Sequence, residues 1–486
     1  MNILVIMSDQ HHPRFMSCAG GPFAETPNLD RIARAGARFE SACCPSPLCG
    51  PSRMSFLSGL YPCRTGVYAN GQALPSDIPT LAHALGAAGY ETALVGRMHI
   101  VGPDHAHGFE RVFPADVTAS TLGGGLSPVL DGLHAGGGVE SLTLSGAGGN
   151  PYQLYDDLVT RRACEFIASS DRRRPFAMVV GFALPHDPYV CSEEDYDRWK
   201  DRVRLPVVAP DDPGATHPAL RDTFERLARA TAEDARRSLA AYCGSISALD
   251  RRVGLILDAL ERAARPEPTL VAYTSDHGEM AGEHGLWHKS CFFEAAVGVP
   301  LLMSLPGEIP AGVVFRPGIN LTDLTATLLD LAGAEPLPEA DGRSFRALWR
   351  GGTWKGTVFS ELGTRWRRSL LARMVRRGSM KYVYYHDLPD MLFDLERDPE
   401  ERRNLAEVPE YAALRAELRA LVLHDWDPQV ISKGLDRWKR RNGVIDRWRR
   451  AAGPPDPHIF RPPEGSAWLR DVPGFVPERR LEEGTY

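Results

Sequence analysis

The sequence predicts an α/β protein, built on a large, mostly parallel mixed sheet that is sandwiched by helices, with a smaller C-terminal α+β domain. Short runs rich in Val, Ile and Leu alternate with helical patterns from Asn2 to Arg350. Strands that alternate with helices favour a parallel sheet covered on both faces. From Lys355 onward, strands in hairpin-like succession precede a helix, which is typical of an α+β domain. At 486 residues the chain is also longer than one core usually organises.

The strands and helices of the large domain follow one another in a regular order. A strand over Asn2 to Met7 opens the chain, and TPNLDRIARAG predicts a helix with Thr26 as N-cap, Pro27 at its first position and Gly36 at its end. A helix in TLAHALGAAGY and a strand in ETALVG come next. The order then repeats with a helix over Tyr155 to Ser169, a strand in PFAMVVGFAL, a helical region from Ala219 to Ala264 and a strand in TLVAYTS.

Composition suggests where the chain divides. A glycine-rich stretch from Thr121 to Asn150 predicts a long surface loop, placed where it could cover a site. The tail from Gly453 to Tyr486 is rich in proline and too short for a core of its own, so it is either loose or packed on a neighbouring subunit. We expect it to pack across subunits of a homo-oligomer, a dimer or a tetramer. The predicted parts are an α/β domain over residues 1–350, an α+β domain over residues 351–430, and a C-terminal helix and extended tail over residues 431–486.

Charge and cysteine content narrow the setting. A net charge of -6 and a pI near 6.2 give no reason to expect binding to nucleic acid or to an anionic membrane. The opening MNILVIMSDQHH lacks the basic leader and cleavage site of a signal peptide, and no apolar run approaches the roughly 18 residues of a membrane span. Nine cysteines, scattered through a long chain, do not form a disulfide framework. We therefore expect a reduced, cytoplasmic protein whose small anionic ligand is held by local charges.

Two aspartates stand at the ends of predicted strands. Asp9 in SDQHH and Asp276 in SDHGE each follow a strand directly. Because the carboxyl ends of parallel strands share one rim of the sheet, the two carboxylates can meet there. Their hard oxygens suit calcium, magnesium or manganese better than zinc, and Gln10 and His277 stand beside them. A strand-end aspartate is also a common helix cap or loop residue, so the metal interpretation depends on the motif that follows.

The segment CGPSR places a thiol where a helix begins. Pro51 fixes the backbone and permits a helix start, which leaves free N–H groups and a positive dipole end directed at Cys49. Arg53, about one turn later, could hold two oxygens of an anion. A cysteine is otherwise most often a small buried hydrophobe, and Cys43, Cys44 and Cys63 are interpreted in that way.

CGPSR followed by MSFLSG resembles the Cys-x-Pro-Ser-Arg signature of type I sulfatases of the alkaline phosphatase superfamily, whose cysteine is oxidised to formylglycine by a separate enzyme. Further segments stand in the order of that family and cover most of Asn2 to Ala406: NILVIMSDQ, TPNLDRIARAG, DIPTLAHALGAAGY, GRMHIVGPDHAHGFER, LPHDPY, YTSDHGEMAGEHGLWHKSCFFE and MLFDLERDPEERRNLA. Several of them, particularly MHIVGPDHAHGFER and GEHGLWHKSCFFE, look most like choline sulfatases, with phosphonate monoester hydrolases close behind. The resemblance implies an alkaline phosphatase-like fold for the large domain.

The resemblance also implies the site residues. One divalent cation, calcium first and manganese or magnesium as alternatives, would be held by Asp9, Gln10, Asp276, His277 and the modified Cys49. The implied catalytic residues are Cys49, Arg53, His99, His186 and Lys289. The implied substrate-binding residues are Asn70, Arg97, His186 and Lys289. A lone histidine or lysine is more often a loop or solvated residue, and the PHDP and WHKS contexts distinguish His186 and Lys289.

One position departs from the family pattern. Arg97 in GRMH stands where the family commonly has lysine in GKxH. A guanidinium keeps the charge but is wider, flatter and a poor proton donor, which favours anion binding and argues against an acid role.

The expected mechanism is attack on sulfur by the gem-diol of formylglycine, with the leaving alcohol protonated by His186 together with Lys289.

Three functions compete at this point. The first is a sulfatase acting on alkyl or aryl sulfate monoesters, the second a phosphonate monoester hydrolase or phosphodiesterase with the same site, and the third a non-catalytic anion-binding relative whose Cys49 is never oxidised. The glycine-rich stretch stands where choline sulfatases are expected to carry tryptophan, so choline is not expected to transfer as the substrate. Trp287, Trp354 and Trp366 are expected to be packed.

Overall fold

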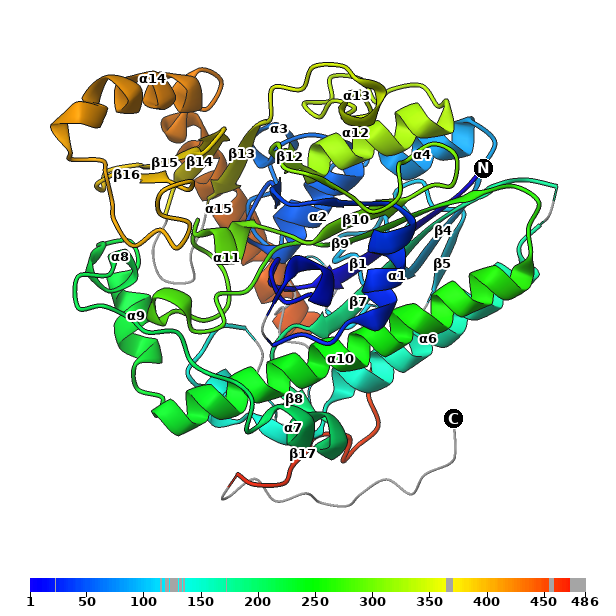
Figure 1. Ribbon diagram of the computed structural model, residues 1–486, viewed down its shortest axis with the longest axis horizontal. Helices are drawn as coiled ribbons and strands as arrows, with labels where there is room; N and C mark the ends of the chain where they lie inside the picture. Colours follow the sequence, from blue (N-terminus) through cyan, green and yellow to red (C-terminus); the bar gives the residue numbers. More distant parts are fainter. Residues whose placement is uncertain are drawn as a thin grey trace.

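An eight-stranded sheet runs through the centre of the computed structural model (Figure 1). Its spatial order is β11-β2-β10-β9-β1-β7-β4-β5, and among the described residues only β10 runs antiparallel to its neighbours. The strands are β1 (Asn2–Asp9), β2 (Ala37–Phe39), β4 (Glu91–Gly96), β5 (Arg111–Phe113), β7 (Phe176–Pro185), β9 (Thr269–Ser275), β10 (Leu301–Ser304) and β11 (Val313–Phe315). The predicted mostly parallel mixed sheet is confirmed. The structure describes all residues except 22, 114–115, 119–121, 123–129, 131–132, 134–135, 172, 364–369, 454–458 and 473–486.

Helices cover both faces of this sheet, as the unbroken apolar runs of its central strands require. Along β1, Ile3, Val5 and Met7 face one core, and Leu4 and Ile6 face the other, because successive side chains of a strand point to opposite faces. The second core is closed by α1 (Pro27–Ala35), α6 (Pro151–Ser169) and α10 (Ala232–Ala263), and the first by α2 (Cys49–Ser58), α4 (Leu81–Ala87) and α12 (Leu321–Ala332). Figure 1 shows the sheet between these two layers.

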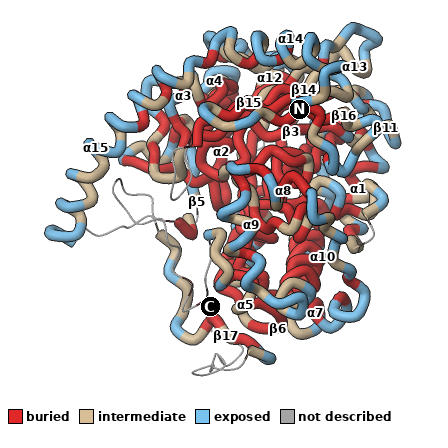
Figure 2. Tube along the Cα trace, turned by 90° about the vertical axis from the view of Figure 1, so that its left-hand side faces the viewer, coloured by how far each residue is buried: buried red, intermediate tan, exposed pale blue. Residues whose placement is uncertain are grey.

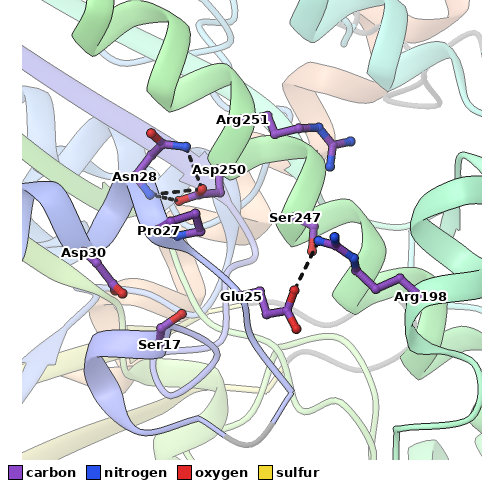
Figure 3. A pocket seen from close by; sticks show the side chains of 9 residues that line it. All are labelled: Ser17, Glu25, Pro27, Asn28, Asp30, Arg198, Ser247, Asp250 and Arg251. Atoms are coloured by element: carbon purple, nitrogen blue, oxygen red, sulfur yellow. Dashed lines mark hydrogen bonds and ion pairs between the residues drawn. The ribbon is translucent and has the colours of Figure 1, made fainter.

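The cap of α1 comes from another helix. Thr26 is the N-cap residue as predicted, but its hydroxyl lies 2.9 Å from the backbone N of Ser17 and caps nothing in α1. The free N–H groups of Asn28 and Leu29 donate instead to Oδ1 of Asp250 from α10, at 3.1 and 2.9 Å. Figure 3 shows Asp250 beside Asn28. A surface cavity of about 390 Å³ adjoins this cap, and no residue predicted for the site lines it.

The helical region predicted from Ala219 to Ala264 is divided into two helices. It consists of α9 (Arg221–Leu227) and α10, separated at Thr231. The break has a local cause, since Thr231 and Asp234 form a capping box that starts α10. The remaining helices are α3 (Pro62–Thr65), α5 (Glu140–Thr143), α7 (Glu193–Trp199), α8 (Pro213–Thr216), α11 (Glu294–Val297) and α13 (Ala347–Arg350), with 3-10 turns at Ser17–Ala19, Glu283–Gly285 and Pro409–Tyr411.

The stretch from Thr121 to Asn150 is not a loop throughout, although much of it lies outside the described residues. It contains α5 and β6 (Gly146–Gly149), and β6 pairs with β8 (Val190–Cys191) and with β17 (Trp468–Leu469) from the C-terminal tail. Glycine is required at this contact, because a Cβ on Gly148 would lie 1.9 Å from the carbonyl oxygen of Trp468. Two short strands, β3 (Ala42–Cys43) and β12 (Ile319–Asn320), form a further pair.

The C-terminal part has its own antiparallel sheet, in the order β13-β14-β15-β16, and α14 packs on it. The helix α15 then projects from the body (Figure 2), with Val444 and Trp448 more than half exposed. In the tail, Phe460 donates its backbone N–H to the carbonyl of Asp116 at 2.6 Å, so this segment contacts its own chain. Packing of the rest of the tail across subunits, and the predicted domain boundaries, stay predictions. These elements are β13 (Thr357–Leu362), β14 (Ala372–Arg377), β15 (Met380–Tyr385), β16 (Met391–Asp394), α14 (Ala412–Leu423) and α15 (Pro428–Ala452).

The cysteines and tryptophans largely follow expectation. All nine cysteines are free; Cys43 and Cys44 are buried, but Cys63 is half-buried because it lies on the short surface helix α3. Trp287 packs with its ring 5.3 Å from that of Tyr189, and Trp354 is partly buried against the core. Trp366 lies outside the described residues. None of the described helices combines the length and apolar character needed to span a bilayer.

Candidate functional site

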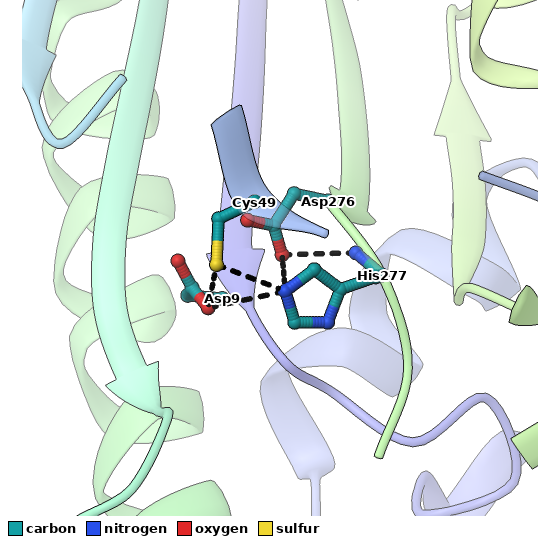
Figure 4. A group of neighbouring side chains, drawn as sticks. All are labelled: Asp9, Cys49, Asp276 and His277. Carbon is teal, nitrogen blue, oxygen red and sulfur yellow. Dashed lines mark hydrogen bonds and ion pairs between the residues drawn. The ribbon is translucent and has the colours of Figure 1, made fainter. Parts of the chain in front are cut away.

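Four predicted side chains meet at the rim of the sheet (Figure 4). Asp9 ends β1 and Asp276 follows β9, and because these strands are parallel neighbours, the two carboxylates emerge side by side. Cys49 is the first residue of α2, and its Sγ lies 3.1 Å from Nε2 of His277 and 3.8 Å from Oδ1 of Asp9. The potential ligand atoms of all four residues lie within 4.8 Å of one another and are buried. Two carboxylates and an imidazole at this spacing fit one divalent cation.

The imidazole of His277 is oriented as a ligand. Its Nδ1 lies 2.9 Å from the carbonyl oxygen of Gly278, an acceptor, so Nδ1 carries the hydrogen. Nε2 therefore directs a lone pair toward Asp9 and Asp276, at 3.7 and 3.6 Å from their Oδ1 atoms. Burial lowers the pKa of His277, which keeps the ring neutral and able to coordinate. A metal-binding histidine characteristically uses its second nitrogen in this way.

Arg53 is buried behind the two carboxylates. Its Nε donates to Asp276 at 2.8 Å, and one terminal nitrogen donates to Asp9 at 3.0 Å. The other terminal nitrogen donates to the carbonyl of Arg97 at 2.7 Å. Burial would raise the pKa of Asp9, but the neighbouring cations, Arg97 foremost, hold it well below its usual range. Arg53 thus fixes the carboxylates, whereas its predicted grip on a substrate anion stays a prediction.

Arg97 and His99 lie just beyond β4 with donor capacity to spare. Nε of Arg97 is 3.1 Å from Oδ2 of Asp9, and its Nη1 atom is buried without a hydrogen-bond partner among the described residues. The same holds for both ring nitrogens of His99, whose backbone N–H donates to Asp116 at 2.9 Å. Burial lowers the pKa of His99 to about 3, so the ring is neutral. Since buried polar groups normally have partners, these atoms suit a polar ligand.

His186 and Lys289 lie together near Asp9. Lys289 Nζ is 2.7 Å from His186 Nε2, and His186 Nε2 is 3.9 Å from Asp9 Oδ1. Burial, aided by Lys289, lowers the pKa of His186 to about 3. Burial also opposes the charge of Lys289, but the acidic groups around it raise its pKa. The proton shared by this pair therefore resides on Lys289.

Two predicted residues have different contacts from those expected. The side chain of Gln10 accepts from Lys289 through Oε1 and donates to Glu279 through Nε2. Asn70 accepts the backbone N–H of Gly50 at 2.9 Å and so holds the start of α2. Metal binding by Gln10 and substrate binding by Asn70 stay predictions.

The thiol of Cys49 is a poor nucleophile as encoded. Burial, and next the charge of Asp9, raise its pKa to about 12. Because the thiolate is the reactive form, an unmodified Cys49 would be inert at neutral pH. The arrangement gives residue 49 a position at the metal cluster without making the thiol reactive.

The sequence reasoning missed a set of buried residues around Lys289. Asp187, Tyr189, Glu279 and His288 form hydrogen bonds with Gln10, His186 or one another. Asp187 and Glu279 stand in the segments PHDP and SDHGE, beside residues that were predicted. Their proximity in sequence was the available signal.

The comparisons with known proteins agree with this geometry. A family model described as sulfatase matches residues 1–334, and one described as N-sulphoglucosamine sulphohydrolase, C-terminal, matches residues 282–425. The chain is 37% identical to a choline-sulfatase of Rhizobium meliloti, over 91% of this chain and 90% of that protein. It is 28% identical to the multifunctional alkaline phosphatase superfamily protein PehA of Trinickia caryophylli, over 85% of this chain and 92% of that protein.

Solved structures show the same fold. The phosphonate monoester hydrolase of Agrobacterium radiobacter matches with a TM-score of 0.72 at 24% identity, covering 87% of this chain and 95% of that one. The sulfatase model spans the whole sheet and every residue of the candidate site. The chain therefore belongs to the sulfatase family of the alkaline phosphatase superfamily and is a sulfuric ester hydrolase.

Proposed function

We propose that this enzyme hydrolyses alkyl or aryl sulfate monoesters after Cys49 has been converted to formylglycine by a separate formylglycine-generating enzyme. One divalent cation, calcium first, would be held by Asp9, Asp276 and His277, with Gln10 and residue 49 at its edge. The observation that carries the proposal is the buried cluster of these ligand atoms, all within 4.8 Å. The hydrated aldehyde supplies a second hydroxyl that a thiol lacks, and the cation supplies positive charge for the sulfuryl oxygens.

The fixed cations of the chain bind and orient the sulfate. Arg97 has a buried donor that finds no hydrogen-bond partner in the described part of the chain, and it faces the same cluster as Lys289, so both can contact sulfuryl oxygens. Preorganised donors of this kind each contribute about 2.7 to 4 kcal/mol to transition-state stabilisation. Arg53 keeps Asp9 and Asp276 in place. The ring nitrogens of His99, which have no hydrogen-bond partner within the ranges that the structure describes, supply a further polar contact.

Lys289 protonates the oxygen of the departing alcohol. It carries the proton because His186 is neutral, and His186 Nε2 accepts one of its three N–H groups. A second N–H is used by Gln10, which leaves the third for the substrate. General acid catalysis of this type contributes roughly 10² to 10⁴ in rate.

Mass spectrometry tests the modification. Protein coexpressed with a formylglycine-generating enzyme should carry the aldehyde at residue 49 and hydrolyse 4-nitrophenyl sulfate, and Cys49→Ala should fold with full loss of turnover. An unmodified thiol in active protein, or an active Cys49→Ala variant, would favour the non-catalytic relative or another nucleophile.

Phosphonate monoester or phosphodiester hydrolysis is the second candidate. The similarity to a multifunctional relative over 85% of this chain favours it, since a site for one tetrahedral anion can take another. Rates on a sulfate, a phosphonate monoester and a phosphodiester with one shared leaving group rank the reactions. Choline sulfate belongs in the same panel, because the relative at 37% identity is a choline-sulfatase. We also propose a homo-oligomer, which light scattering tests.

A further inference from the structure

Lys289 donates hydrogen bonds to His186 and Gln10, and each of these side chains has an alternative tautomer or orientation in which it could not accept them. Its Nζ donates to Nε2 of His186 and to Oε1 of Gln10. An imidazole can present either a lone pair or an N–H, and an amide can present either its oxygen or its nitrogen. What faces Lys289 is therefore decided by the partners on the far side of each group.

Asp187 decides the state of His186. The Nδ1 atom of His186 lies 2.6 Å from the carbonyl oxygen and 3.1 Å from Oδ1 of Asp187. Both are acceptors, so the hydrogen of the neutral ring sits on Nδ1, and Nε2 presents its lone pair to Lys289. The other carboxylate oxygen of Asp187 accepts the backbone N–H of Gly136 at 2.8 Å.

Glu279 is the main group that orients Gln10, whose Nε2 also lies 3.4 Å from Oδ1 of Asp187 and 3.4 Å from the hydroxyl of Tyr189. Oε2 of Glu279 accepts from Nε2 of Gln10 and from the hydroxyl of Tyr189 at 2.9 Å. Its Oε1 accepts the backbone N–H groups of Ala281 and His288, at 2.9 and 2.6 Å. With the amide nitrogen of Gln10 held in this way, its oxygen faces Lys289.

We propose that Asp187 and Glu279 are positioning residues that hold His186 and Gln10 as two acceptors for Lys289, so that its third N–H is delivered to the leaving-group oxygen. The inference rests on the proposed role of Lys289 as the acid. Both carboxylates are fully buried, and among the described residues neither forms a hydrogen bond or ion pair with a member of the four-residue metal cluster. They therefore act on the proton donor and not on the nucleophile.

Isosteric amides disrupt this arrangement in a defined way. Every group named above that contacts the carboxylates of Asp187 and Glu279 is a hydrogen-bond donor. When asparagine or glutamine replaces either residue, its amide nitrogen, which is itself a donor, must therefore face another donor whichever way the amide is oriented. In Glu279→Gln the amide oxygen of the new side chain faces the backbone N–H groups of Ala281 and His288, which require an acceptor. The amide nitrogen then faces Gln10, which must turn and present its own nitrogen to Lys289. In Asp187→Asn the amide nitrogen opposes either the N–H of Gly136 or the two donors that meet Oδ1, which are Nδ1 of His186 and Nε2 of Gln10. The backbone carbonyl of residue 187 remains as an acceptor for His186, so the expected effect is a displaced imidazole.

The test compares two aryl sulfates, since 4-nitrophenolate leaves without protonation and phenolate needs it. Asp187→Asn and Glu279→Gln should lower kcat on phenyl sulfate by about tenfold or more beyond any loss on 4-nitrophenyl sulfate. Asp250→Asn is the matched control, because Asp250 is also a buried carboxylate that accepts backbone N–H groups, here those that begin α1 (Figure 3), and the substitution should affect both esters alike. Equal losses on both esters in the two variants would overturn the inference.

A variant of Lys289 separates this inference from the proposed function. If Lys289→Ala shows no extra loss on phenyl sulfate, the acid assignment itself fails. If it does and the two amide variants do not, only the positioning role fails.

The double variant Gln10→Glu with Glu279→Gln restores an acceptor toward Lys289 and should raise the rate on phenyl sulfate at least severalfold above that of Glu279→Gln alone. No recovery would overturn the orientation assigned to Gln10, and this comparison tests the inference even if Asp187→Asn does not fold.

Discussion

Arg53 and Asp276 form a fully buried ion pair, with Nε of the guanidinium 2.8 Å from the carboxylate. A second donor of Arg53 reaches Asp9 at 3.0 Å, so one guanidinium connects the ends of β1 and β9. Two carboxylates this close would otherwise repel each other in a site that excludes water. The CGPSR motif therefore places two functions on adjacent turns of α2, the reactive position at its first residue and the support of the metal ligands one turn later.

Arg53→Lys should inactivate the enzyme although it keeps the charge. A lysine has no planar fork, so it cannot contact Asp9, Asp276 and the carbonyl of Arg97 together. Breaking a buried pair costs about 3 to 5 kcal/mol of the free energy of unfolding, and a lysine would lose part of that. We expect kcat/KM to fall at least about 100-fold. Urea denaturation and steady-state kinetics check both effects, and a variant with normal stability and activity would contradict the supporting role.

Removal of divalent cations should destabilise the protein as well as stop turnover. The cluster of Asp9, Asp276 and His277 exists only in the folded state, so a cation present at 100 times its dissociation constant stabilises folding by about 2.7 kcal/mol. Chelation should lower the melting temperature, and calcium should restore it. The control is Asp276→Asn, whose melting temperature should respond much less to chelator. Identical melting curves of the wild type with and without chelator would argue against a metal site.

The buried strands, the rim where their ends meet and the start of α2 could be predicted from the sequence, because local residue patterns and the order of the strands determine them. The apolar runs of β1, β7 and β9 identify buried parallel strands, and the rule that strand ends share one rim brings Asp9 to Asp276 across more than 260 residues. The start of α2 follows from Pro51. The residues carried over from the family motif lie around one cluster, with Gln10 and Asn70 bonded in ways that no motif indicates.

What could not be predicted depends on contacts between distant segments. Asp250 caps α1 from another helix, and Glu279 reaches Gln10 across the site. The strand β6 in the glycine-rich stretch exists because β8 and the tail strand β17 pair with its two edges, and the residue pattern GAGG carries no strand propensity of its own. Such hydrogen bonds satisfy buried groups whose partners become known only once the chain has folded.

Arg97→Lys should retain activity, and Arg97→Met should not. Arg97 places a buried charge 3.1 Å from Asp9, and lysine preserves that charge where methionine removes it. We expect Arg97→Met to lose about 10² to 10³ in kcat on sulfate esters. Arg97→Lys should stay within about tenfold of the wild type and gain relative rate on phenyl sulfate over 4-nitrophenyl sulfate, since an ammonium can give up a proton more readily than a guanidinium. Full activity in Arg97→Met would exclude Arg97 from anion binding.

Asp156→Asn should change how stability depends on pH. Asp156 is buried on α6 and accepts the backbone N–H groups of Ala183 and Leu184, at 2.8 and 2.9 Å. Burial raises its pKa from 3.8 to about 7. Between these two values the folded protein holds a proton that the unfolded chain has released, so this group makes the free energy of unfolding fall as the pH rises from about 4 to about 7, by on the order of 4 kcal/mol in total.

An asparagine has no such proton, so the variant should lack this decline, and its stability relative to the wild type should rise steadily over that window and level off above it. Urea denaturation at pH 4.5, 6 and 8 checks the slope. In the variant, the amide nitrogen faces one backbone N–H that the carboxylate had accepted, and this costs the same free energy at every pH. The cost therefore lowers the free energy of unfolding equally at the three pH values and leaves its dependence on pH unchanged. A difference between variant and wild type that does not change with pH would show that Asp156 is ionised throughout.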